Sequence, residues 1–171
     1  MNKLKIGIIG CGTISSIYME NCQKFEHLDL VACADLDEQR AQSQAVRFGI
    51  PKACSVDELL NDSTIELVIN LTIPKAHAEV CIAALEAGKH VYTEKPLAVT
   101  REEGRLILET AKKKNRLVGS APDTFLGAGI QTAIHLIEQG EIGVPIGASA
   151  FMINRGHEHL RRLFWQAMVN D

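Results

Sequence analysis

Lys5–Ser15, KIGIIGCGTIS, has the residue types that bind a phosphate group at the start of a helix. An apolar run leads into Gly10, which suits a tight turn because glycine tolerates conformations that a side chain forbids. Gly12 leaves the backbone bare, so a pyrophosphate can approach the free N–H groups at a helix start. Ser15 stands third in this fingerprint, where a small residue allows close packing between helix and strand.

Asp35 ends the next apolar run, LVACAD, at about twenty residues from the glycines, where an acid typically accepts both hydroxyls of an adenosine ribose. A strand before the glycines and a helix after them distinguish a dinucleotide site from a glycine turn with a surface aspartate. The Asp35 carboxylate would repel a 2′-phosphate, which favours NAD as the cofactor. Arg40 follows five residues later and could serve a phosphate, so NADP stays possible.

Two further polar clusters follow predicted strands: Thr72, Pro74 and His77 come first, then Glu94 and Lys95. Ligands of open parallel sheets bind beyond the carboxyl ends of the strands. An ammonium such as that of Lys95 can polarise a reacting hydroxyl or carbonyl and share its proton while a hydride moves. Pro96 favours an extended Lys95 that can face the cleft. The alternatives are a solvated surface lysine and a helix-start histidine without chemistry.

Strand and helix patterns alternate along the chain and predict an α/β protein with a doubly wound parallel sheet, the Rossmann fold. In the first helix Ile14, Ile17, Tyr18 and Phe25 are expected on one face, and in the last helix of the sheet Leu106 and Leu108 are among the apolar positions. The predicted strands are residues 5–9, 28–34, 52–54, 66–72, 90–94 and 116–120, and the predicted helices follow the glycines and span 37–48, 56–60, 76–87 and 100–115.

Composition shifts at SAPDTFLGAG, residues 120–129, which predicts a dinucleotide-binding domain over 1–121 and a second segment over 122–171. In that segment a helix carries an apolar stripe of Ile130, Ala133, Ile134 and Ile137, and residues 144–154 read as a strand. Such a strand without a partner would expose an edge and an apolar face, so we expect the chain made alone to self-associate or to have a disordered end.

Net charge is −3 with no basic stripe, which argues against a nucleic-acid partner. No apolar run approaches membrane-spanning length and no signal peptide is recognisable, so we expect a cytoplasmic protein without a membrane partner. The five cysteines form no CxxC pair and are typical of buried thiols in a reducing compartment. His157, Glu158 and His159 do not have the spacing of a helical zinc motif, so no metal is predicted.

The segments GCGTIS, ACADLDEQRA, TIPKAH and GKHVYTEKPLA, in this order, resemble the Gfo/Idh/MocA family of oxidoreductases over about residues 3–153. The resemblance implies NAD(P)-dependent hydride transfer to or from a small sugar or polyol, and a full-length form that is a homo-oligomer. It implies that Lys95 is the catalytic lysine beside the substrate. The implied cofactor contacts are Gly10, Gly12, Thr13 and Ile14 for the pyrophosphate, Asp35 for the adenosine ribose, Thr72, Pro74 and His77 along the cleft, and Glu94 near the nicotinamide ribose.

The resemblance ends after about Glu158, and the Asp and His that complete the family's catalytic group are not found in this chain. Residues 122–171 are therefore interpreted as the truncated beginning of an α+β substrate domain, and the tail as the product of a frameshift or a truncated gene. The alternative function is a non-catalytic dinucleotide-binding module. A methyltransferase using S-adenosylmethionine is disfavoured, because Ile8 stands where that class carries an acid before its glycines.

Overall fold

The computed structural model describes residues 3–151 and 153 of the chain. The chain forms two compact units, Met1–Ala121 and Pro122–Asp171, and each is described here by itself. The division into a dinucleotide-binding domain over 1–121 and the beginning of a second domain over 122–171 stays a prediction.

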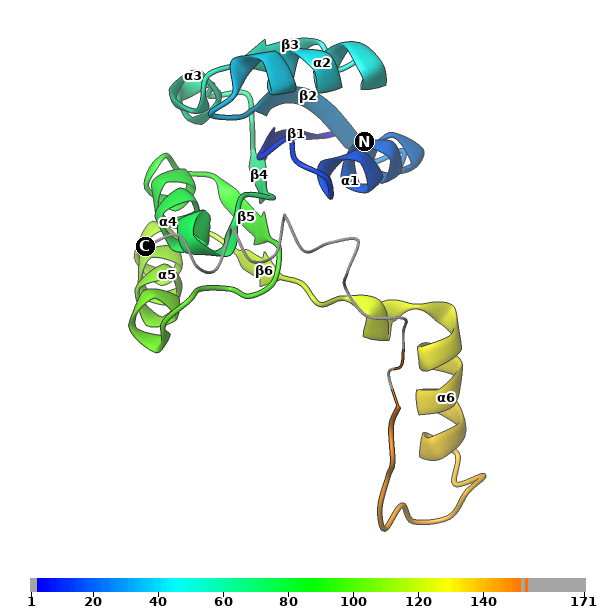
Figure 1. The fold of residues 1–171 in the computed structure, drawn as a ribbon. Helices are drawn as coiled ribbons and strands as arrows, with labels where there is room; N and C mark the ends of the chain where they lie inside the picture. Colours follow the sequence, from blue (N-terminus) through cyan, green and yellow to red (C-terminus); the bar gives the residue numbers. More distant parts are fainter. Residues whose placement is uncertain (1–2, 152, 154–171) are drawn as a thin grey trace. The chain divides into compact units, whose positions relative to one another are not determined.

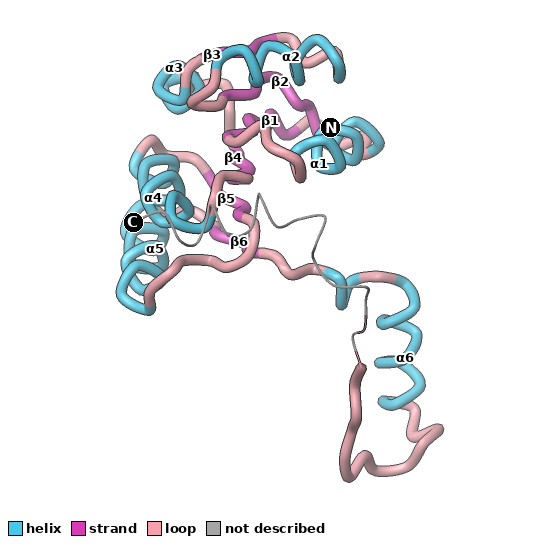
Figure 2. Tube along the Cα trace, viewed as in Figure 1, coloured by secondary structure: helices cyan, strands magenta, loops and turns pink. Residues whose placement is uncertain are grey.

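The first unit is built on a six-stranded sheet in the order β3-β2-β1-β4-β5-β6, in which every pair of neighbouring strands is parallel (Figures 1 and 2). The order reverses between β1 and β4, so the chain leaves these adjacent strands in opposite directions. This confirms the predicted doubly wound sheet. The strands are β1 Leu4–Ile9, β2 Leu28–Ala34, β3 Lys52–Cys54, β4 Leu67–Asn70, β5 His90–Thr93 and β6 Val118–Ser120.

Helices cover both faces of the sheet, and each face has its own apolar cluster. One cluster joins β1 and β2 to α1 and α2 and is centred on Ile6, Ile8 and Met19. The other joins the sheet to α3, α4 and α5 and includes Val68, Leu85 and Ile107. The helices are α1 Ser15–Lys24, α2 Glu38–Phe48, α3 Val56–Asn61, α4 His77–Glu86 and α5 Arg101–Lys114, with a 3-10 turn η1 at Pro74–Ala76.

Side-chain caps set where three of these helices begin. Asp37 accepts the Arg40 N–H at the start of α2, and a Ser55–Glu58 capping box begins α3. Thr100 and Glu103 form a second capping box on α5, which ends in a left-handed Asn115. These caps stand at the carboxyl ends of β2 and β3 and in the loop after β5. They make the helix starts sharp where the strands end.

The apolar residues that the sequence singles out in α1 and α5 are mostly not the ones that pack on the sheet. Ile14, Ile17 and Phe25 are 43–60% exposed, and α1 instead buries Ser15, Met19 and Cys22 against the sheet. Likewise Leu106 and Leu108 are at least half exposed, whereas α5 buries Ile107, Thr110 and Ala111. In each helix the buried face instead combines one large apolar side chain, Met19 or Ile107, with smaller residues.

The second unit contains a 3-10 turn η2 at Thr124–Leu126 and the helix α6 at Ala128–Glu138. No strand forms in the described part of residues 144–153, which corrects the strand expected there. A strand is stable only through hydrogen bonds with a neighbour, and the described part of this unit offers none. The His157–His159 cluster and the tail lie outside the described residues.

Within the described part of the chain, no helix is long and apolar enough to cross a membrane. The five cysteines are free thiols, and all but Cys54 are buried.

Candidate dinucleotide-binding site

The glycine turn leaves β1 at the point where the strand order reverses. Gly10 has φ +99°, and its N–H donates to Ala34 O of β2 at 2.8 Å. A Cβ on Gly10 would lie 2.6 Å from the carbonyl carbon and oxygen of Leu71. Only glycine therefore fits between the ends of β1 and β4.

Gly12 lies in open space, since no atom comes within 4 Å of the position a Cβ would take. Thr13 and Ile14 follow, both exposed, and lead into α1, whose N-cap Ile14 makes no side-chain capping hydrogen bond. The start of α1 is thus left for an anion, which its N–H groups and dipole favour. Ser15 is fully buried and its hydroxyl donates to Gly12 O at 2.7 Å, which fixes the turn. These residues fit a bound pyrophosphate.

Asp35 comes directly after β2 and faces the glycine turn. Its Oδ2 accepts the Cys11 N–H at 2.7 Å, and its Oδ1 accepts the Asp37 N–H at 2.9 Å. Arg40 on α2 lies 3.3 Å from Asp35 Oδ1 and 3.3 Å from Asp37 Oδ2. The predicted ribose acid and the predicted phosphate ligand are therefore ion-paired to each other, with Arg40 half exposed.

Cys11 stands between the two glycines with its side chain buried. A hydrogen bond with the Cys33 thiol, together with burial, raises the pKa of the Cys11 thiol. The thiol accordingly stays protonated at neutral pH. The Cys11 side chain therefore adds no negative charge beside an anion at the start of α1.

The end of β4 carries a network of buried polar groups. Asn70 is fully buried, and its Oδ1 accepts both the N–H and the hydroxyl of Thr72, at 3.2 and 2.6 Å. His77 is 1% exposed, with Nε2 3.0 Å from Thr72 O and Nδ1 2.6 Å from Pro96 O. His77 thus joins the loop after β4 to the loop after β5, rather than presenting its ring at the surface. Pro74, half-buried, begins the 3-10 turn between Thr72 and His77.

Glu94 and Lys95 follow β5 directly. The Glu94 N–H donates to Asn70 O at 3.0 Å, so β4 sets where this segment begins. Glu94 Oε1 accepts the Tyr18 hydroxyl at 2.8 Å, and Oε2 accepts the Lys95 N–H at 2.9 Å. Lys95 is exposed, and within the described residues its ammonium makes no ion pair. The peptide bond between Lys95 and Pro96 is cis.

The structure therefore gathers the predicted residues at the carboxyl ends of β1, β2, β4 and β5. Two functional contacts were missed from the sequence. Asn70 lies in a predicted strand that is otherwise apolar, so the sequence gives no sign of its contacts. Tyr18 stands 76 residues from its partner Glu94, so no local pattern joins these two residues. Among the described residues no group of three potential metal ligands occurs, and the absence of a metal stays a prediction.

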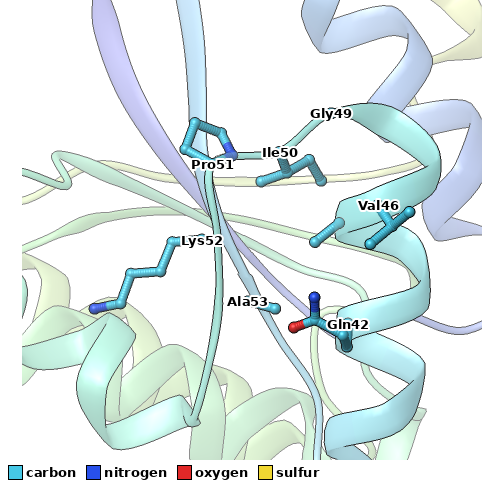
Figure 3. Close-up of a pocket in the computed structure, with 8 residues that line it drawn as sticks. Gln42, Val46, Gly49, Ile50, Pro51, Lys52 and Ala53 are labelled. Atoms are coloured by element: carbon cyan, nitrogen blue, oxygen red, sulfur yellow. The ribbon is translucent and has the colours of Figure 1, made fainter.

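A hollow elsewhere in the first unit involves none of these residues. It lies between α2 and the start of β3, the opposite end of the strand from the carboxyl edge, and includes Gln42, Val46, Pro51 and Lys52 (Figure 3). In Figure 3 the Lys52 side chain extends away from α2. Nothing in its lining has the chemistry of a nucleotide site.

Comparison with known proteins gives the family of the chain. Residues 4–121 match the Gfo/Idh/MocA oxidoreductase family, described as an NAD-binding Rossmann fold. The chain is 34% identical over 147 residues to an inositol 2-dehydrogenase of Salmonella typhimurium and 32% identical over 146 residues to a 1,5-anhydro-D-fructose reductase of Ensifer adhaerens. Those alignments cover 84% and 85% of this chain.

A crystal structure of an NAD-binding oxidoreductase from Klebsiella pneumoniae superposes with a TM-score of 0.78 at 29% identity, over 84% of this chain and 41% of that one. The chain spans about 44% of the length of the two curated relatives. The family match covers more than half of the chain and includes the glycine turn, Asp35 and Lys95. The chain belongs to the Gfo/Idh/MocA family of oxidoreductases and contains its NAD-binding Rossmann domain.

Proposed function

We propose that this chain is the cofactor-binding part of an NAD(P)-dependent oxidoreductase that acts on a cyclitol or another sugar-like polyol. The observation that carries the proposal is the meeting of the glycine turn, Asp35 and Lys95 at one edge of the sheet. The related proteins named as inositol dehydrogenase and anhydrofructose reductase support this substrate class.

In this proposal Gly10, Gly12, Thr13 and Ile14 hold the pyrophosphate at the start of α1. Asp35 binds the adenosine ribose, and Arg40 beside it admits a 2′-phosphate, so NAD is the expected cofactor and NADP an alternative. Thr72, Pro74 and His77 form the cleft wall, and Glu94 binds the nicotinamide ribose. His77 contributes to the cleft wall indirectly, because its ring fixes the Thr72 and Pro96 carbonyls.

Lys95 has the exposure that a proton-handling residue needs. The bound nicotinamide accepts or supplies the hydride. In the reducing direction the Lys95 ammonium would give a proton to the carbonyl oxygen while the hydride reaches its carbon, and in the oxidising direction the Lys95 amine would take that proton from the hydroxyl. The backbone of Lys95 is held by Glu94, which leaves only the side chain free to adjust.

The test measures NAD reduction by the chain with myo-inositol and a panel of sugars and polyols, alongside NAD affinity by calorimetry. We expect Lys95→Met to lower kcat by about 100-fold or more, the usual contribution of proton transfer, with NAD affinity unchanged within about threefold. Lys52→Met, an exposed lysine on β3, is the matched control and should behave as the wild type.

Turnover that survives in Lys95→Met would contradict the assigned role of the lysine. Failure of the chain to bind NAD would contradict the proposal, whereas tight NAD binding without turnover on any substrate would favour the non-catalytic module. That outcome has a physical basis, since this chain spans less than half of its curated relatives.

A further inference from the structure

Tyr18 connects the helix that begins at the glycine turn with the segment that carries Lys95. It is the fourth residue of α1, and its hydroxyl donates to Glu94 Oε1 at 2.8 Å. Its ring is half-buried and lies 6.5 Å from the ring of Tyr92 on β5, with a tilt of 49°. The ring contact fixes where the hydroxyl points.

The Glu94 carboxylate links Tyr18 to the backbone of Lys95. Its other oxygen, Oε2, accepts the Lys95 N–H, so one carboxylate joins the hydroxyl of α1 to the backbone of the lysine. An ionised carboxylate has about four acceptor positions, and these two bonds leave acceptors for a ligand's hydroxyls. Hydrogen bonds to a charged acceptor are about twice as strong as neutral ones.

Three contacts therefore hold the segment Glu94–Pro96, and two of them come from the β4 side. The Glu94 N–H donates to Asn70 O, and Pro96 O contacts the His77 ring. The hydroxyl of Tyr18 supplies the third contact, and it is the one that reaches the segment from α1. Removing it leaves the fold of the segment in place but frees the Glu94 side chain.

We propose that Tyr18 is a positioning residue that holds the Glu94 carboxylate in place for the ribose on the nicotinamide side, and thereby couples the start of α1 to the Lys95 segment. The inference rests on the proposed function, because it assumes that a dinucleotide binds along this edge. Tyr18 itself contacts neither the phosphates nor the adenosine in this arrangement. Its effect is confined to the half of the dinucleotide that reaches Glu94.

The test compares binding of NADH with binding of ADP, which lacks the second ribose and the nicotinamide, to the full chain by calorimetry. We expect Tyr18→Phe to weaken NADH binding by about tenfold and to change ADP binding by less than about twofold. Tyr92→Phe is the matched control, since it removes a hydroxyl from the other ring of the pair. It should leave both affinities unchanged.

A double-mutant cycle separates positioning from packing. If Tyr18 acts through Glu94, then Tyr18→Phe in a Glu94→Ala background should cause no further loss of NADH affinity. Additive losses, an equal loss for ADP, or no loss in Tyr18→Phe would each overturn the inference while leaving the proposed function intact. A wild-type chain that binds neither ligand would overturn both.

Discussion

Arg40 stands where it would affect how the proposed ribose-binding acid Asp35 discriminates between NAD and NADP. Its guanidinium lies within 3.5 Å of both oxygens of Asp35 and also pairs with Asp37. The repulsion that Asp35 alone would exert on a 2′-phosphate is therefore partly offset by a cation at the same place. Half of the Arg40 side chain is exposed, whereas the Asp35 side chain is only 9% exposed, so a turn of Arg40 toward a phosphate would weaken this ion pair.

We expect Arg40→Ala to weaken NADP binding by about tenfold, because a charge-assisted hydrogen bond to phosphate is lost. NAD affinity should change by less than about threefold. Titration of both cofactors measures the ratio, and Arg47→Ala on the same helix is the control, since Arg47 lies over the Phe48 ring. An equal change for both cofactors would mean that Arg40 does not recognise the 2′-phosphate.

The turn between β1 and α1 depends on its two glycines for different reasons. At Gly10 a side chain would meet the backbone of Leu71 and require a positive φ, whereas at Gly12 it would meet nothing. The fold requires the first glycine, and we propose that the ligand requires the second. A pair of alanine substitutions separates these requirements.

We expect Gly10→Ala to lower the free energy of unfolding by about 3 kcal/mol, from overpacking and backbone strain. Gly12→Ala should change stability by less than about 1 kcal/mol but weaken NAD binding by at least about tenfold, because its methyl group occupies the approach to the backbone. Urea unfolding and calorimetry measure the two effects. Normal NAD affinity in a folded Gly12→Ala would argue against a pyrophosphate at this turn.

At the opposite edge of the sheet, Lys89 closes the turn between α3 and β4. It is 3% exposed, and its ammonium donates to Asp62 O at 2.7 Å and Ile65 O at 3.0 Å. Burial lowers the pKa of Lys89 from its usual value. The unfolded chain consequently binds this proton more tightly than the folded chain.

Between the lowered pKa of folded Lys89 and the ordinary lysine pKa of about 10.4, this group makes the free energy of unfolding rise with pH. The gain is complete above the ordinary value and is lost as pH falls through the lowered pKa. We expect the stability difference between wild type and Lys89→Met to grow as pH rises from neutral into that window, in urea unfolding at each pH. A pH-independent difference would contradict the role of burial.

The elements that sequence patterns predict well are the strands bounded by turn residues and the capped helices. β2 and β3 begin and end where their apolar runs meet turn residues, and α5 begins at the capping pattern of Thr100 and Glu103. The glycines and Asp35 could be predicted because a local spacing encodes their chemistry. Tyr18 and the buried His77 could not, because their contacts join loops and helices that only the folded sheet brings together.

The second unit differs from the first in how much of its helix α6 is exposed. In α6 no residue is buried, and Ile130, Ile134 and Ile137 of its predicted stripe are 38–45% exposed. Isoleucines at helical spacing form an apolar stripe, and contiguous exposed stripes usually mark contact surfaces. Self-association of the chain follows as an expectation, in line with the homo-oligomer proposed for the full-length form.

We expect the purified chain to show a mass that rises with concentration in light scattering. Ile134→Glu should shift it toward the monomer, because a charge in an apolar contact is costly to bury. Gln139→Glu adds the same charge beyond the stripe and should associate as the wild type does. A monodisperse monomer at every concentration would contradict an exposed contact surface on α6.

The proposed site binds one dinucleotide across the carboxyl ends of β1, β2, β4 and β5. Calorimetric titration of the full chain with NADH tests this claim most directly. We expect one saturable site per chain and at least about tenfold weaker binding in Asp35→Asn, which keeps an acceptor for the Cys11 N–H but loses the charge. Asp57→Asn, on α3, should bind as the wild type does. The absence of saturable binding, or equal affinity in Asp35→Asn, would contradict the account.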